Sequence, residues 1–201
     1  MSKGEQTREM ILERAAQLFS RQGYFGSSLS DIMHETGLEK GGIYNHFESK
    51  EQLALEAFDY AFALVQQRTR LAITGKKNAV DRLLAFVAVF QTIIEDPVLA
   101  GGCPVLNTAV EADDAHIPLR DRARHAMDIW RDSIQHIVRK GIERQEIRAD
   151  VDADAFATVF ISLLEGAIMM SKLYQDAIHV RRAADHLTRY IEKELRLPAV
   201  E

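Results

Sequence analysis

Apolar residues recur every three or four positions along almost the whole chain, which is the period of amphipathic helices. The first helix is predicted from about residue 7 to residue 22, ending at Gly23. Its apolar stripe comprises Ile11, Leu12, Ala15, Leu18 and Phe19. No segment alternates apolar and polar residues between hairpin dipeptides. We therefore expect an all-α fold.

Two short helices follow the first one. Ser28 followed by Asp31 approximates a capping box and predicts a helix that ends near residue 36. Gly37 stands where a left-handed turn is needed, and a third helix is predicted from about Lys40 to His46. Two helices joined by a short turn that contains glycine form a helix-turn-helix.

The rest of the chain predicts six more helices, of which the first is capped by Ser49 with Gln52. They lie at about 49–72, 83–94, 104–112, 117–145, 153–175 and 178–196. Apolar residues surround nearly all of the helix at 153–175, so it must be buried on two sides. A second copy of the chain is the simplest partner for the second side.

Composition restricts the class of protein. The 201 residues are 47% hydrophobic with a net charge of -5, which argues against sequence-blind binding to nucleic acid or anionic membranes. The opening residues lack the apolar run of a secretory signal, and the apolar segments at 83–90 and 156–170 are shorter than a bilayer requires. The single cysteine, Cys103, fits a reducing compartment. We expect a soluble, cytoplasmic protein.

The stretch TGLEKGGIYNHFESKEQL, residues 36–53, raises the question of why two glycines stand side by side in a helical pattern. Each costs about 1 kcal/mol relative to alanine. At the start of the second helix of a helix-turn-helix, missing side chains would let the backbone approach DNA closely. Ile43 and Phe47 are predicted to anchor this helix in its own core.

The segment SLSDIMHETGLEKGGIYNHFESKEQL resembles the signature of the TetR family of bacterial one-component regulators, with a Ser before the second helix, a Gly turn, and Tyr, His, Phe and a Ser-Lys pair. The resemblance is close over residues 7–55 and extends to the rest only in helical plan and length. It implies a DNA-binding domain at 1–50 and an effector-binding, dimerising domain at 51–201. It also implies a homodimer on palindromic DNA, a small-molecule effector, and most commonly repression, although activation stays open.

Position by position, the resemblance implies DNA contacts from nine residues. Phosphate contacts would come from Ser28, Tyr44, His46 and Lys50. Base or groove contacts would come from Ser30, Lys40, Gly41, Gly42 and Asn45, although Asn45 is equally explained as a solvated surface residue. This chain departs from the family pattern at Glu39, often a capping Ser or Thr, and at Gly42, often Thr, Ser or Ala.

The C-terminal domain would hold the effector, with plain core packing as the alternative role for each pocket residue. The expected pocket residues are Phe86, Phe90, Leu106, Trp130, Phe160 and Met169. The expected dimer interface comprises Phe156, Phe160, Leu164, Ile168, Leu187 and Ile191. We expect no metal and no cofactor, and interpret the acidic segment at 95–118, including Glu111, Asp113, Asp114 and His116, as a solvated surface.

Cys103 follows two glycines at a predicted helix start, where the helix dipole lowers a thiol pKa. One hypothesis is a sensor of electrophiles or oxidants, and the alternative is an inert buried thiol. Two other functions are weighed against DNA binding: a small helical enzyme that uses Cys103 with His125, and an interaction protein that docks through the helix at 153–175. The chain carries no recognised nucleophile motif or phosphate-binding loop, so we expect no enzyme.

Overall fold

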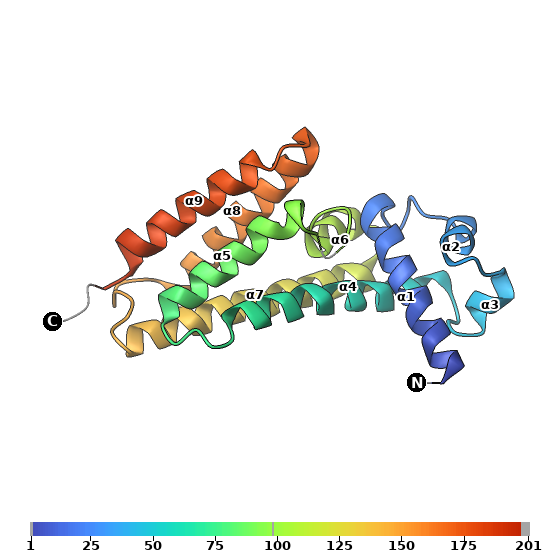
Figure 1. The fold of residues 1–201 in the computed structure, drawn as a ribbon, viewed down its shortest axis with the longest axis horizontal. Helices are drawn as coiled ribbons and strands as arrows, with labels where there is room; N and C mark the ends of the chain where they lie inside the picture. Colours follow the sequence, from blue (N-terminus) through green and yellow to red (C-terminus); the bar gives the residue numbers. More distant parts are fainter. Residues whose placement is uncertain (1, 98, 198–201) are drawn as a thin grey trace. The chain divides into compact units, whose positions relative to one another are not determined.

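The computed structural model describes residues 2–97 and 99–197 (Figure 1). Within them the helices are α1 (Lys3–Gln22), α2 (Leu29–Thr36), α3 (Lys40–Tyr44), α4 (Lys50–Ile73), α5 (Ala79–Glu95), α6 (Pro104–Ala112), α7 (Ile117–Glu143), α8 (Ala153–Tyr174) and α9 (Ile178–Tyr190). A π-helical turn, η1 (Ile191–Leu195), continues α9. The all-α prediction, with about nine helices, is confirmed.

Several helix ends differ from the predicted ones, and the fifth helix starts at Ala79 rather than near residue 83, because Asn78 caps it by accepting a hydrogen bond from Val80 N. The first helix starts earlier, at Lys3, because Ser2 and Glu5 form a reciprocal capping box at its N-terminus. The third helix ends at Tyr44, two residues early, because the N–H groups of His46 and Phe47 both turn back to the Ile43 carbonyl, at 3.0 and 3.2 Å.

The chain divides into two compact units: residues 1–65 with 98–126, and residues 66–97 with 127–201. Helices α4 and α7 each contribute to both. These units do not test the expected domain boundary after residue 50, which stays a prediction. The expected domains also include residues 1, 98 and 198–201, which lie outside the described residues.

The first unit is built around one apolar cluster where α1, α2, α3 and the start of α4 meet. Its buried members include Ile11, Ile32, Ile43, Phe47 and Leu53. All but Phe47, which lies between α3 and α4, come from the apolar stripe of their own helix, so the local period of three to four residues already selects most of the core face. The anchoring role predicted for Ile43 and Phe47 is confirmed, since each is only 1% exposed.

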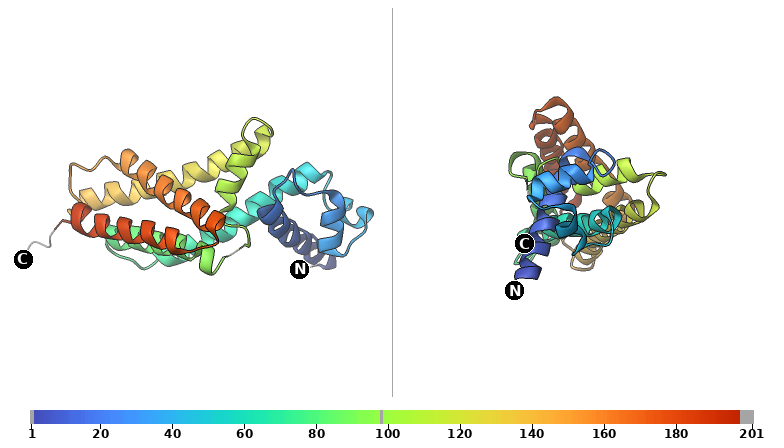
Figure 2. Two further views of the ribbon diagram at one scale, coloured as in Figure 1. Left: turned by 90° about the horizontal axis from the view of Figure 1, so that it is seen from above. Right: turned by 90° about the vertical axis from the view of Figure 1, so that its right-hand side faces the viewer.

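In the second unit α5, α8 and α9 pack on one another, and α8 and α9 lie side by side (Figures 1 and 2). By length and composition α8 would qualify as a membrane span, contrary to the expectation from its apolar run. Half of its most apolar window is buried inside the protein, however. That burial is the pattern of a core helix in a soluble protein.

Candidate nucleic-acid interface

Local hydrogen bonds fix the start of α2, and one left-handed glycine ends it. Asp31 N donates to Ser28 Oγ at 3.2 Å and Ser28 N donates to the Asp31 carboxylate at 2.7 Å, which confirms the predicted capping box. The Ser28 hydroxyl, and then its backbone N–H, hold the pKa of Asp31 below its usual range. Gly37 has a φ of 68°, and its N–H donates to Met33 O at 2.9 Å, which ends α2.

The outer face of α3 is solvent-exposed because its inner face is fixed to the core. Arg8 of α1 stacks 4.7 Å from the centre of the Phe47 ring and pairs with Glu56 of α4. The residues left at the surface are Ser28, Ser30, Lys40, Gly41, Tyr44 and Asn45, whereas Gly42, His46 and Lys50 are partly buried. Six of the nine residues predicted to contact DNA are thus exposed, and the other three are partly buried.

The two glycines of α3 have no explanation inside the chain. A Cβ atom at Gly41 would meet nothing within 4 Å, and one at Gly42 would lie in ordinary contact, 3.4 Å from the Leu38 side chain. Their φ angles are not left-handed, since neither is among the positive-φ glycines. Alanine would therefore fit at both positions and favour the helix. What the glycines provide is bare backbone, on an exposed surface at Gly41 and on a partly buried one at Gly42.

Lys50 faces inward. Its Nζ donates to Tyr24 O at 2.7 Å and lies 4.2 Å from the centre of the Tyr24 ring. Burial lowers the pKa of Lys50, against a smaller opposing effect of Glu111 and Asp31. The ammonium thus braces the turn between α1 and α2, a role that the sequence did not indicate.

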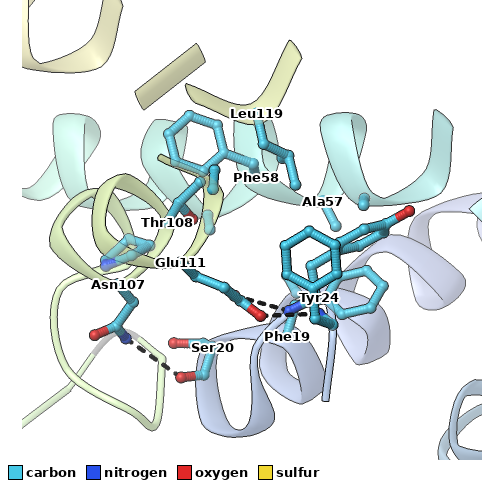
Figure 3. Close-up of a pocket in the computed structure, with 15 residues that line it drawn as sticks. Phe19, Ser20, Tyr24, Ala57, Phe58, Asn107, Thr108, Glu111 and Leu119 are labelled. Atoms are coloured by element: carbon cyan, nitrogen blue, oxygen red, sulfur yellow. Dashed lines mark hydrogen bonds between the residues drawn. The ribbon is translucent and has the colours of Figure 1, made fainter. Parts of the chain in front are cut away.

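Glu111 holds the same turn from α6. Its carboxylate accepts hydrogen bonds from Tyr24 N at 2.9 Å and Phe25 N at 2.8 Å (Figure 3). A Cβ atom at Gly23, whose φ is 79°, would lie 2.4 Å from Glu111 Oε1, so glycine is required there for this approach. The expectation of a solvated surface is wrong for Glu111, which is partly buried, whereas Asp113 and Asp114 are exposed.

Asn107 makes a second link between α6 and α1. Its Nδ2 donates to Gly101 O at 2.8 Å. It also donates to Ser20 O at 3.4 Å (Figure 3). Gly101 has a φ of 110°, and a Cβ atom there would lie 2.0 Å from Ser20 O. The helical spacing of Pro104, Asn107 and Glu111 places all three on one face of α6, and that spacing was the signal available in the sequence.

The family models match both halves of the chain. The model of bacterial regulatory proteins of the tetR family matches residues 11–57, and a tetracyclin repressor-like C-terminal domain matches residues 79–187. The chain belongs to the TetR family. It is accordingly a helix-turn-helix transcriptional regulator and not an enzyme.

Individual proteins that are similar to this chain are also named as transcriptional regulators. The crystal structure of a TetR transcriptional regulator from Chloroflexus aurantiacus is 49% identical, with a TM-score of 0.95 over 98% of this chain and 100% of that one. The HTH-type transcriptional repressor DhaR of a Mycobacterium species is 30% identical over 83% of this chain and 82% of its own. The uncharacterized regulator YxaF of Bacillus subtilis is 28% identical over 96% and 98%.

The residues expected to bind an effector in this TetR-family chain fall into two groups. Phe86, Phe90, Trp130 and Phe160 pack ring against ring in the second unit, with centroids 5.2 to 5.7 Å apart, and each is at most 2% exposed. Met169 of the same unit is 54% exposed. Cys103 and Leu106 belong to the first unit, where Cys103 is 0% exposed at the N-cap of α6 and Leu106 is partly buried.

The residues expected at the dimer interface are covered by their own chain. All six are buried, and Phe156 is the most exposed at 7%. The apolar side chains that α8 leaves at the surface are a different set: Val159, Met169, Met170, Leu173 and Tyr174. The sequence could show that α8 is apolar on both sides, but not which side its own chain covers.

Proposed function

We propose that this regulator is a repressor that binds palindromic double-stranded DNA as a homodimer and leaves it when a small molecule acts on the C-terminal domain. The observation that carries the proposal is the exposed face of α3, where bare backbone at Gly41 and Gly42 lies between Lys40 and Tyr44. The repressor named among the relatives supports the sign of regulation.

The proposed contacts follow from this surface. In a helix-turn-helix the second helix enters the major groove, with its early residues at the base edges. Lys40, Gly41, Gly42 and Asn45 would lie there together with Ser30 of α2, while Ser28, Tyr44 and His46 contact phosphates. Lys50 would act mainly by bracing Tyr24, because its ammonium already donates to Tyr24 O.

The proposed dimer uses the exposed face of α8. Val159, Leu163, Gly166, Met170 and Leu173 follow one another at helical spacing. Val159 and Leu173 lie seven residues before and after Gly166. Two antiparallel copies related by a two-fold axis at Gly166 would therefore set each Val159 against the partner's Leu173, as an isologous interface requires. The absent side chain at Gly166 would let the two helices approach.

The effector acts because its affinity for the DNA-released state is higher than its affinity for the DNA-binding state. A dimer holds its recognition helices about 34 Å apart to enter successive major grooves, so a small rearrangement releases DNA. A non-covalent small molecule is the principal candidate. An electrophile would need a local opening to reach Cys103, because that side chain is 0% exposed. The site of action is the bacterial cytoplasm, where the DNA lies.

The proposal is tested by selecting bound duplexes from a random-sequence library at fixed salt. The expected product is an inverted repeat, and a selection that yields only single half-sites or no preferred sequence contradicts the dimeric repressor. On the selected duplex, Lys40→Ala is expected to weaken binding about tenfold and to lower the salt dependence, since it removes a positive charge at the DNA. Lys77→Ala, at an exposed lysine in the other unit, is the matched control.

A further inference from the structure

The fold makes no use of the Glu39 side chain. Glu39 directly precedes α3, at the position where TetR-family chains often have a capping Ser or Thr, but its side chain makes no hydrogen bond to the α3 backbone. It is exposed, and its carboxylate forms no hydrogen bond or ion pair within the described residues. A Ser or Thr here would stabilise the start of the helix, so the fold itself does not favour a glutamate.

Neighbouring cations do not neutralise the Glu39 carboxylate. Arg21 of α1 is paired instead with Glu35 of α2, at 2.8 Å. Lys40, the next residue, has its Nζ 5.7 Å from the centre of the Tyr44 ring and forms no ion pair with Glu39. An unpaired carboxylate beside DNA is repelled by the phosphates. That repulsion is offset if the carboxylate meets a hydrogen-bond donor of the DNA.

A DNA duplex offers such donors only at the base edges, because the oxygens of its backbone accept hydrogen bonds. In the major groove the donors are the N4 amino group of cytosine and the N6 amino group of adenine. Adenine carries the N7 acceptor beside its amino group, whereas the edge of cytosine carries no acceptor. A carboxylate is an acceptor only, so cytosine is its better partner. The early residues of the second helix in a helix-turn-helix face these edges.

We propose that Glu39 selects a cytosine in each half-site of the operator by accepting a hydrogen bond from the N4 amino group of that base. Glu39 is thus a specificity-determining residue in addition to the nine residues predicted to contact DNA. In a two-fold symmetric dimer the same base is selected in both half-sites. The inference rests on the DNA binding proposed above, and it explains why α3 begins without a capping side chain.

The test compares the duplexes that the original chain and Glu39→Gln select from a random-sequence library at the same salt. The original chain should require cytosine at one position of each half-site. Glu39→Gln should accept thymine there as well, because an amide both donates and accepts hydrogen bonds. Replacing that cytosine by thymine in one half-site should weaken binding of the original chain about tenfold, and of Glu39→Gln less than about twofold. A 5-methylcytosine, which adds only the methyl group of thymine, should bind the original chain as cytosine does.

Two further variants complete the test. Glu13→Gln, at an exposed residue of α1, is the matched control and should select the same cytosine as the original chain. Glu39→Ser should supply a cap, unfold at a higher denaturant concentration and lose the cytosine preference, which separates a lost contact from a damaged fold. If Glu39→Gln requires the same cytosine, the inference is wrong and the repressor proposal stands. If the original chain selects no preferred sequence, both are wrong.

Discussion

Helices α3 and α8 both contain residues that their own chain does not explain, but in opposite ways. α3 lacks a side chain where one would fit, because a Cβ atom at Gly41 would meet nothing within 4 Å. α8 instead exposes large apolar side chains at the surface, with Leu173 72% exposed and Val159 62% exposed. Bare backbone suits close approach to DNA, and an exposed apolar stripe suits another helix. The two anomalies thus indicate two different partners.

Glycines elsewhere in the chain supply the contrast. A Cβ atom at Gly23 would lie 2.4 Å from Glu111, and one at Gly101 would lie 2.0 Å from Ser20 O. Both residues also have left-handed φ angles, of 79° and 110°. The fold itself requires these two glycines, whereas it tolerates a larger residue at Gly41 and at Gly166.

The largest expected effect comes from placing a charge on the exposed face of α8. Leu173→Glu should give a monomer in sedimentation experiments, because the carboxylate would be buried against the partner. Operator affinity should fall about 1,000-fold, since the two half-sites would no longer be bound together. Val110→Glu, at a 74% exposed valine of α6, is the matched control. A Leu173→Glu protein that stays dimeric would show that another surface mediates assembly.

Gly101→Ala tests the glycines that the fold requires. It should lower the free energy of unfolding by about 3 kcal/mol, because it combines backbone strain with a clash against Ser20 O. Gly75→Ala, at a φ of 83° with nothing within 4 Å, has the strain alone and should cost about 1 kcal/mol. Denaturant unfolding of both variants measures the difference, and equal losses would contradict the contact argument.

Replacing Gly41 or Gly166 by alanine should affect two different binding events: DNA binding through α3 and dimerisation through α8. Gly41→Ala should stabilise the fold by about 0.5–1 kcal/mol yet weaken DNA binding about tenfold. Gly166→Ala should leave DNA contacts intact and weaken dimerisation. Thermal unfolding, mobility shift and sedimentation are the measurements. A Gly41→Ala protein that binds DNA as tightly as the original chain would leave the glycine pair without a function.

The smallest expected effect is on stability and comes from removing the Ser28 cap at the start of α2. Ser28→Ala should cost about 1 kcal/mol at neutral pH. The folded-state pKa of Asp31 is lowered by Ser28, so this stabilisation is present above the unfolded pKa of about 3.9 and is lost as pH falls through the lower folded value. The difference in the free energy of unfolding between the original chain and Ser28→Ala should therefore become smaller at acidic pH. A difference that is constant with pH would exclude the Asp31 contribution.

Features that depend on neighbours in the sequence were predictable. The caps at Ser28 and Ser49, the end of α1 at Gly23 and the left-handed Gly37 are set by residues within about one helical turn. The family signature around Tyr44 lies in this same local region, which is why the helix-turn-helix and the family could be predicted. The DNA, dimer and effector assignments of individual residues stay predictions.

Only the tertiary structure determined which residues distant along the chain bond to one another. Glu111 bonds residues 86 and 87 positions away, and Lys50 turns inward to a carbonyl 26 positions away. The face of α8 that remains exposed was likewise decided by the packing of α5 and α9. The sequence by itself determined the helices, their caps and the family, because these depend on local spacing. Side-chain partners and exposed faces depend on how the helices pack, and no local pattern specifies that.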